Sequence, residues 1–307
     1  MKALVTGCAG FIGSHLVDKL LGLGNYVIGM DCFTDYYLRT IKEENIAVAL
    51  ENRNFSFIEE DILELDQFPN VDIVFHLAAQ AGVRASWGRS FEIYTRNNIE
   101  ATQKLLEFYK NRKIQKFVFA SSSSVYGDAE LPTKEDSLLK PVSPYGVTKL
   151  AGENLCYLYW KNYNLPTISL RYFTVYGPRQ RPDMAIHKFI RAILKGEEIV
   201  VFGNGMQTRD FTYVDDAVEA TMLAAVSKNM GEVFNVGGGT RISINELIKR
   251  LEEIIGIKAK VQNIEKQKGD VINTLSDIIK INNLGWTPKI SIEEGIEREI
   301  AWYKNKE

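Results

Sequence analysis

The chain opens with the apolar run Ala3-Leu4-Val5-Thr6 and continues directly into Gly7-Cys8-Ala9-Gly10-Phe11-Ile12-Gly13. Residues 11–23 then follow a helical pattern. Glycine lets the backbone turn sharply and approach a pyrophosphate without an intervening Cβ. The N-terminus of the following helix adds free N–H groups and the positive end of a dipole. Glycine triplets also form ordinary tight turns, but the strand–loop–helix context favours a dinucleotide-binding loop.

Outward from this loop, apolar runs of strand length alternate with helical patterns. We expect strands at 3–6, 26–30, 55–59, 71–75, 117–120 and 167–170, and helices at 11–23, 93–109 and 145–163. Such alternation predicts an α/β fold with a doubly wound parallel (Rossmann) sheet covered on both faces. The strands read as unbroken apolar runs, which suits burial on both sides.

The amino-acid composition changes after about Arg171, where Gly, Pro and Arg become frequent. Here we expect helices at 184–194, 214–227, 244–255 and 292–303, and a strand at 199–202. We therefore divide the chain into a dinucleotide-binding domain over 1–170 and a smaller α/β domain over 171–307. The chain is expected to re-enter the first domain near 211–236.

Composition excludes several classes of protein. The 307 residues carry a formal net charge of -2 without a long block of one sign, so a nucleic-acid partner is not expected. The odd, scattered cysteines Cys8, Cys32 and Cys156 predict neither a metal site nor a disulfide framework, and favour a reducing cytoplasm. There is no signal-peptide pattern, and no apolar run approaches the ~18 residues of a membrane span.

Three further sites at predicted strand ends suit the rest of a dinucleotide. Asp31 ends the second strand, 18 residues after Gly13, where a carboxylate holds the adenosine ribose hydroxyls. A carboxylate repels a 2′-phosphate, so Asp31 favours NAD over NADP; the alternative is a surface aspartate. Asp61 and Ile62 follow the third strand and are expected to contact the adenine. The segment Leu77-Ala78-Ala79 follows the fourth strand, and its small side chains are expected to let the cofactor lie against the backbone.

Tyr145-Gly146-Val147-Thr148-Lys149 is the most informative short segment. Positions four apart share one face of a helix, so the Lys149 ammonium lies near the Tyr145 phenol. A phenol of pKa near ~10 is a poor base at neutral pH, and a nearby cation lowers that value. The pair then suits proton exchange with a sugar hydroxyl. The alternative, an exposed aromatic–lysine pair, is less expected downstream of the glycine loop and the serine-rich strand end at 120–127.

Together, Gly-x-x-Gly-x-x-Gly, Ser122, Tyr145 and Lys149 resemble the extended short-chain dehydrogenase/reductases, and within them the NAD-dependent sugar-nucleotide epimerase/dehydratase family. The resemblance covers nearly the whole chain. It implies a catalytic triad of Ser122, Tyr145 and Lys149, and tightly bound NAD. It also implies that Asn98 supports the active-site hydrogen bonds and that Tyr172 lies at the cofactor, whereas Ser121 and Ser124 are expected to satisfy backbone groups of a turn. Dimerisation is implied, through helices near 99–109 and 150–159; the alternative is that the apolar residues of these helices belong to the core.

The residues after Ser122 separate members of the family. Dehydratases that resemble this chain carry Asp-Glu there, whereas Ser123-Ser124 offers no acid, which disfavours elimination. The segment from Thr174 to Arg181-Pro182-Asp183-Met184 resembles the UDP-glucuronate 4-epimerases. Arg181 suits a forked contact with the sugar carboxylate, to which Thr174 adds a hydroxyl. A surface arginine is the alternative for Arg181.

The resemblance thus implies interconversion of UDP-glucuronate and UDP-galacturonate through a 4-keto intermediate, with transient hydride transfer to NAD. UDP-glucose 4-epimerisation and oxidative decarboxylation of UDP-glucuronate remain open, as does a non-catalytic dinucleotide sensor. The remaining residues expected to bind substrate are Arg84, Ser123, Phe202, Arg209 and Asp270. Some relatives carry an arginine where Gln267 stands, and Lys268 is expected to compensate. His15, His76 and His187 are interpreted as structural.

Overall fold

The computed structural model describes residues 1–265 and 268–306. Its centre is a seven-stranded parallel sheet in the order β11-β6-β5-β4-β1-β2-β3. These strands are β1 (Lys2–Thr6), β2 (Tyr26–Asp31), β3 (Phe55–Glu59), β4 (Ile73–His76), β5 (Lys116–Ser122), β6 (Thr167–Tyr172) and β11 (Glu232–Val236). The predicted α/β fold class is therefore confirmed. The strand order reverses between β1 and β4, the place where open parallel sheets bind ligands.

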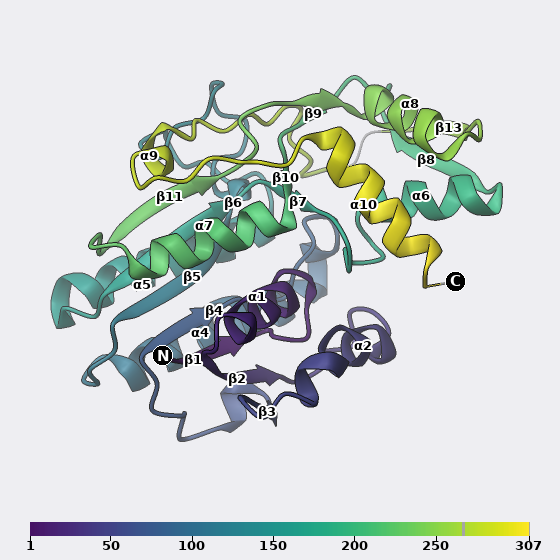
Figure 1. Ribbon diagram of the computed structural model, residues 1–307. Coiled ribbons are helices and arrows are strands. Elements are labelled where there is room, and N and C mark those ends of the chain that lie inside the picture. Colours follow the sequence, from purple (N-terminus) through teal and green to yellow (C-terminus); the bar gives the residue numbers. More distant parts are fainter. Residues whose placement is uncertain (266–267, 307) are drawn as a thin grey trace.

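Helices cover both faces of this sheet (Figure 1). Ala3 and Val5 of β1 share one core with α1 (Phe11–Gly22) and α7 (Val214–Val226). Leu4, between them, shares the opposite core with α4 (Ala101–Tyr109) and α5 (Pro144–Tyr163). Successive strand side chains point to opposite faces, so the unbroken apolar run of β1 serves two helical layers.

Most of the elements after β6 form a smaller layer beside the carboxyl ends of the strands (Figure 1). Its strands pair as β7 (Thr174–Tyr176) with β10 (Phe211–Tyr213), β8 (Glu198–Phe202) with β13 (Lys260–Ile264), and β9 (Thr208–Arg209) with β12 (Ile242–Ser243). Its helices are α6 (Ala185–Lys195), α8 (Ile244–Ile255), α9 (Ile279–Asn282) and α10 (Ile292–Lys304). Between them the chain returns to the large sheet through α7 and β11; the domain division itself stays a prediction.

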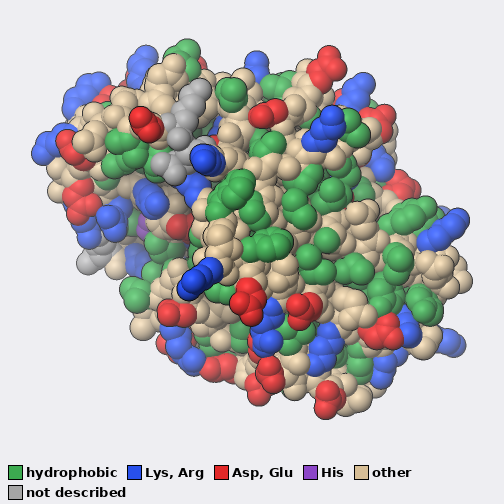
Figure 2. Space-filling view, turned by 180° about the vertical axis from the view of Figure 1, so that it is seen from behind, with side chains coloured by type: hydrophobic (Ala, Val, Ile, Leu, Met, Phe, Trp, Pro, Cys, Tyr) green, Lys and Arg blue, Asp and Glu red, His purple; other side chains and the backbone are tan. Residues whose placement is uncertain are grey.

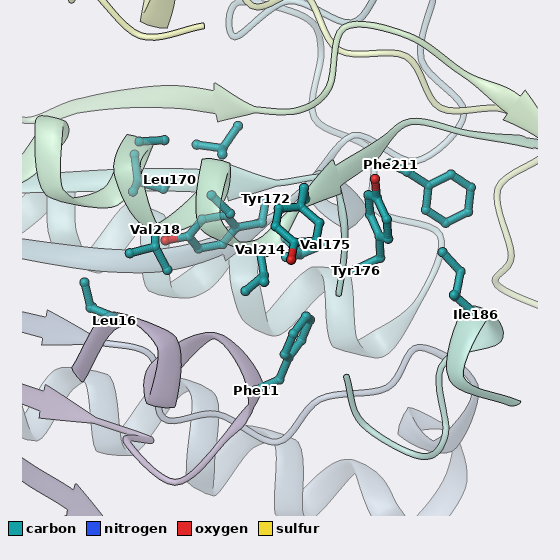
Figure 3. Packing of buried hydrophobic residues seen from close by; sticks show 14 of the residues in the cluster. Phe11, Leu16, Leu170, Tyr172, Val175, Tyr176, Ile186, Phe211, Val214 and Val218 are labelled. Carbon is teal, nitrogen blue, oxygen red and sulfur yellow. The ribbon is translucent and has the colours of Figure 1, made fainter. Parts of the chain in front are cut away.

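A continuous hydrophobic core joins the large sheet and its helices to the smaller layer. Figure 3 shows Phe11, at the start of α1, pointing toward Val214 of α7 and Val175 of β7. The same cluster extends through Phe211 to Ile186 of α6. Because this core runs from the glycine loop into the smaller layer, it fixes the position of one layer against the other.

Two segments differ from the sequence-based expectation. The helix expected at 93–109 is divided into α3 (Phe91–Thr95), a π-helical segment at Arg96–Glu100, and α4. Single π turns often occur at functional sites, and this one contains the inward-facing Asn98. The helix α2 (Arg39–Leu50) was not predicted, because polar Lys42 and Asn45 occupy two of its four buried positions. Within 1–265 and 268–306, no helix is long and apolar enough to span a membrane.

Candidate active site

Two adjoining cavities lie at the carboxyl ends of the sheet. The first, of about 390 Å³, lies at the reversal between β1 and β4. It is lined by nearly all of the residues expected to bind the cofactor: Gly7, Gly10, Phe11, Ile12, Gly13, Asp31, Asp61, Ile62, Leu77, Ala78, Ala79, Tyr145, Lys149 and Tyr172. The tertiary structure therefore gathers segments from the ends of six strands, β1 to β6, and from α5 around one space.

The glycine loop leaves no room for side chains. Gly7 has φ of +70°, and a Cβ on it would lie 2.7 Å from the Ala78 amide nitrogen. A Cβ on Gly13 would lie 2.1 Å from the carbonyl oxygen of Gly7. The loop thus folds tightly onto the N-terminus of α1, with its backbone open to the cavity. This cradle fits a dinucleotide pyrophosphate.

Asp31 lies at the end of β2, at the cavity wall. Its carboxylate accepts hydrogen bonds from the amides of Ala9 at 3.1 Å and Phe33 at 2.9 Å. Burial raises the pKa of Asp31, while these amides and the Lys42 ammonium act in the opposite direction. Lys42 also lines the cavity. Lys42 was not predicted as a site residue, because the sequence pattern did not indicate α2.

The predicted triad comes together in the lining of the same cavity. Tyr145 and Lys149 lie one turn apart on α5, and Ser122 ends β5. Lys149 is buried and donates to the Ala120 carbonyl at 2.8 Å, and burial lowers its pKa to about 8. Tyr145 shares a hydrogen bond with Ser122. The triad is thus assembled from two elements that are adjacent only in the folded chain.

The electrostatic balance at Tyr145 differs from the expectation. Burial raises the pKa of this phenol in the cofactor-free protein. The Ser122 hydrogen bond and the charge of Arg181 act in the opposite direction. The guanidinium of Arg181 is therefore a cation that acts on the phenol, one that the sequence pattern alone did not place there.

Asn98 supports the cavity wall from behind. Its side chain accepts from the Gln80 amide at 2.7 Å and donates to the Gln80 carbonyl at 3.0 Å and to Thr148 Oγ1 at 2.9 Å. It is buried, and the cavity lining contains Asn97 instead. Asn98 therefore lies behind the cavity lining, where it supports Gln80 and the Tyr145 helix, and its place among the cofactor-binding residues stays a prediction.

A buried ion pair lies beneath the serine segment. Glu153, one turn after Lys149, accepts from Arg171 Nε at 2.9 Å and Nη2 at 2.8 Å, with both side chains at most 4% exposed. Ser121 donates to the same carboxylate. Tyr126 receives a hydrogen bond from Arg171 at 2.8 Å. These contacts, which the sequence analysis missed, hold the end of β5 against α5.

The histidines lie in structural settings. His76 is buried between Thr6 and Thr102, and burial lowers its pKa to about 3. His15 Nε2 bonds the Pro178 carbonyl at 2.8 Å. The ring of His187 packs edge-on against Tyr303. Among the described residues, no group of three His, Cys, Asp or Glu side chains is positioned to hold a metal ion.

The second cavity, of about 750 Å³, lies in the smaller layer. It is lined by five of the residues expected to bind substrate, Arg84, Thr174, Phe202, Arg209 and Asp270. Arg84 bonds Asp270 at 2.6 Å and lies over the Phe202 ring, 4.0 Å from its centroid. Thr174 lines both cavities, so it marks their junction. Gln267 falls outside the described residues, and the neighbouring Lys268 is exposed.

The last substrate candidates, Ser123 and Arg181, line the first cavity. Arg181 forms a two-point ion pair with Asp183, through Nε to Oδ1 at 2.9 Å and Nη2 to Oδ2 at 3.1 Å. Tyr36 donates to Asp183 Oδ2 at 3.1 Å. Tyr36 comes from the loop after β2, and neither it nor Asp183 was predicted as a site residue.

Comparison with known proteins agrees with this geometry. The model of the "NAD dependent epimerase/dehydratase family" matches residues 3–237. A UDP-glucuronate 4-epimerase of Thermodesulfobacterium geofontis is 43% identical over 311 residues, which cover 98% of this chain and 95% of that protein. The crystal structure of a UDP-glucuronic acid 4-epimerase from Bacillus cereus with UDP-glucuronic acid and NAD superimposes with a TM-score of 0.98, at 46% identity and with 100% of both chains covered.

Another relative carries a different name. The "uncharacterized UDP-glucose epimerase YtcB" of Bacillus subtilis is 44% identical over 308 residues, covering 98% of each chain. The family is NAD dependent, which confirms the expected cofactor. The cradle of Gly7 and Gly13 at the reversal of the sheet, the triad beside it and these matches lead to one conclusion: the chain belongs to the NAD dependent epimerase/dehydratase family.

Proposed function

We propose that the protein is a UDP-glucuronate 4-epimerase that interconverts UDP-glucuronate and UDP-galacturonate. One observation carries the proposal: the Arg181 guanidinium lines the same cavity as Tyr145 and Ser122, with Thr174 at the junction to the second cavity. A planar cation with a forked set of donors suits a sugar carboxylate next to the reacting carbon. The names of the two 4-epimerases described above support this reading.

In this mechanism Tyr145 is the base that takes the proton of the 4-hydroxyl group. Ser122 hydrogen-bonds the same oxygen and the phenol, and the Lys149 ammonium favours the phenolate. NAD, which the loop of Gly7 and Gly13 and the Asp31 carboxylate would hold, would supply the acceptor of the carbon-4 hydride and, once the 4-keto sugar has turned over, the source of the hydride for its opposite face. Tyr145 then gives the proton back to the new hydroxyl group. Neither the proton nor the hydride is lost, so the reaction is an isomerisation.

Residues around the carboxylate protect the 4-keto sugar from a side reaction. A 4-keto uronic acid is a β-keto acid, which loses carbon dioxide when the breaking bond stands perpendicular to the ketone plane. Arg181 and Thr174 would hold the carboxylate nearer that plane, and Ser123 lines the same cavity. Ser123-Ser124 offers no acid for an elimination.

The second cavity is proposed to take the UDP group. Arg209 and Arg84 supply positive charge for the diphosphate, and the ring of Phe202 supplies an apolar face. Burial lowers the pKa of Arg209, which is nevertheless a strong base and stays charged. With Thr174 at the junction, a sugar joined to UDP would reach from this cavity to Tyr145.

UDP-glucose 4-epimerisation is the second candidate. The name of the Bacillus subtilis relative favours it. A neutral sugar has no carboxylate for Arg181, so the two candidates differ in what Arg181 contributes. Incubation of the purified enzyme with each UDP-sugar, followed by separation of products and measurement of carbon dioxide and NADH, distinguishes them.

We expect UDP-galacturonate to form from UDP-glucuronate without carbon dioxide or accumulating NADH. Arg181→Ala should lower kcat/KM for UDP-glucuronate by about 100-fold, and for UDP-glucose far less, because only the acid loses a charged, forked partner. Equal losses would remove the carboxylate role of Arg181. Released carbon dioxide with accumulating NADH would instead establish oxidative decarboxylation.

We also propose a homodimer formed through α4 and α5, in a reducing cytoplasm. Tyr157 and Leu158 on α5 are 52% and 47% exposed. Figure 2 views this side of the molecule and shows apolar side chains gathered on it. Large exposed apolar groups favour a protein interface. Light scattering should give twice the chain mass, and Leu158→Glu should give a monomer; an unchanged mass for this variant would contradict the interface.

A further inference from the structure

The guanidinium of Arg181 already has a carboxylate partner within its own chain. Asp183 accepts from Nε and Nη2, and Tyr36 bonds the same aspartate at Oδ2. The Tyr36 ring lies under the guanidinium, 5.8 Å from ring centroid to Cζ. Because a guanidinium carries five N–H groups, this grip leaves the Nη1 group unengaged by Asp183. Arg181 is therefore held from one edge.

This pair differs from the buried ion pair beneath the site. Arg171 and Glu153 are 3% and 4% exposed, whereas Arg181 and Asp183 are 22% and 37% exposed. The buried pair of Arg171 and Glu153 is closed to solvent and has a structural role. The second pair borders a cavity and water, so its arginine remains accessible to another anion.

We propose that Asp183 is a positioning residue that sets the preference between acidic and neutral sugars. Its carboxylate orients the Arg181 guanidinium. It is also a counter-ion within the chain, and a substrate carboxylate that binds Arg181 must do so beside it. The inference rests on the proposed function, in which Arg181 receives that carboxylate. When a uronic acid binds, two negative groups share one guanidinium, and their repulsion weakens binding of the acid alone. When the sugar is neutral, Asp183 keeps the arginine paired, so the guanidinium is not left without a counter-ion.

Tyr36 gives this arrangement its rigidity. A Cβ on Gly82 would lie 2.2 Å from the Tyr36 hydroxyl oxygen, so the ring fills the space over that glycine. The hydroxyl group is thereby aimed at Asp183 from the loop that follows Asp31. Asp183 is held between an arginine and a tyrosine that come from different layers of the protein.

Asp183→Asn tests the proposal, because it removes the charge and nearly preserves the shape. Dissociation constants for UDP-glucuronate and UDP-glucose are measured by calorimetry in a Tyr145→Phe background, which prevents turnover. We expect the affinity ratio of acid to neutral sugar to rise about tenfold, and binding of the acid to become more sensitive to salt. Asp183→Ser should act in the same direction, since it also removes the charge. Steady-state assays should show the change in KM for the acid rather than in kcat.

The chain offers a closely matched control two residues away. Arg179 pairs with Asp18 of α1 at 2.7 Å, with exposures of 22% and 38%, and neither residue lines the two cavities. Asp18→Asn should leave the affinity ratio unchanged. The proposal is overturned if Asp183→Asn and Asp183→Ser leave the affinity ratio unchanged or lower it. A purely structural role of Asp183 would weaken the binding of both sugars by the same factor. If the wild-type enzyme does not epimerise UDP-glucuronate, the proposed function itself fails, which is a separate result.

Discussion

The Lys149 ammonium donates a hydrogen bond to the carbonyl oxygen of Ala120, 2.8 Å away at the end of β5. This contact joins the helix of Tyr145 to the strand of Ser122, two residues after Ala120. Lys149 therefore has two roles in the cofactor-free fold: it holds the two parts of the triad together and brings a buried positive charge to them.

Tyr145→Phe should abolish most turnover and leave the fold intact. The variant loses the group that exchanges a proton with the sugar, which contributes about 10²–10⁴-fold in rate. Product formation from UDP-glucuronate should fall by that factor, while the circular dichroism spectrum and NAD content stay as in the wild type. Turnover at the wild-type rate would show that another group is the base.

Lys149 should make stability depend on pH in a defined direction. Its pKa of about 8 in the fold lies below the 10.5 of an exposed lysine, so the folded chain holds this proton less tightly than the unfolded chain. The free energy of unfolding of the wild type should therefore rise between about pH 8 and pH 10.5, by about 2–3 kcal/mol relative to Lys149→Met.

Urea unfolding of nucleotide-free protein at several pH values measures this difference. Lys161→Met, at the exposed end of the same helix α5, serves as the control and should follow the wild type. Parallel pH curves for the wild type and Lys149→Met would contradict the assignment of a destabilised buried ammonium.

Two glycines of α1 should respond oppositely to the same substitution. A Cβ on Gly13 would lie 2.1 Å from the Gly7 carbonyl oxygen, whereas a Cβ on Gly22 would meet nothing within 4 Å. Gly13→Ala must displace the loop and should weaken NAD binding by more than about tenfold, since backbone N–H groups hold the pyrophosphate. Gly22→Ala should bind NAD normally and gain about 0.5–1 kcal/mol of stability.

Fluorescence titration with NAD and thermal melting distinguish these outcomes. Equal affinity of the two variants for NAD would contradict the prediction, because it would mean that the loop accommodates a Cβ at Gly13 without moving.

Glu153→Gln should destabilise the fold and impair catalysis together. It leaves the Arg171 guanidinium buried without its carboxylate partner, which costs about 3–5 kcal/mol. It also weakens the hold on Ser121, next to the catalytic Ser122. Adding Arg171→Met should recover part of the stability, because the unpaired charge is then gone. Urea denaturation of the two single variants and the double variant tests this, and strictly additive losses would contradict the coupling.

Local patterns of apolar residues predicted much of the fold. The boundaries of β3 and α8 match the predicted ones, and most other predicted elements differ by one to three residues. The reason is physical: apolar residues that recur with the period of a buried strand or an amphipathic helix carry that information in a few neighbouring positions. The helix α2 was missed because Lys42 and Asn45 occupy buried positions that an apolar pattern would fill.

The sequence by itself determined the strand–loop–helix of Gly7 to Gly13, the Tyr145–Lys149 spacing and the absence of an acid after Ser122, because each depends on residues close together in the chain. Only the tertiary structure decided which distant groups meet. Asp183 accepts a hydrogen bond from Tyr36, which is 147 residues away, and Glu153 pairs with Arg171 beneath the serines. Such partners are chosen by how the layers pack and by the charges that packing brings within hydrogen-bonding distance, and no local spacing encodes that choice.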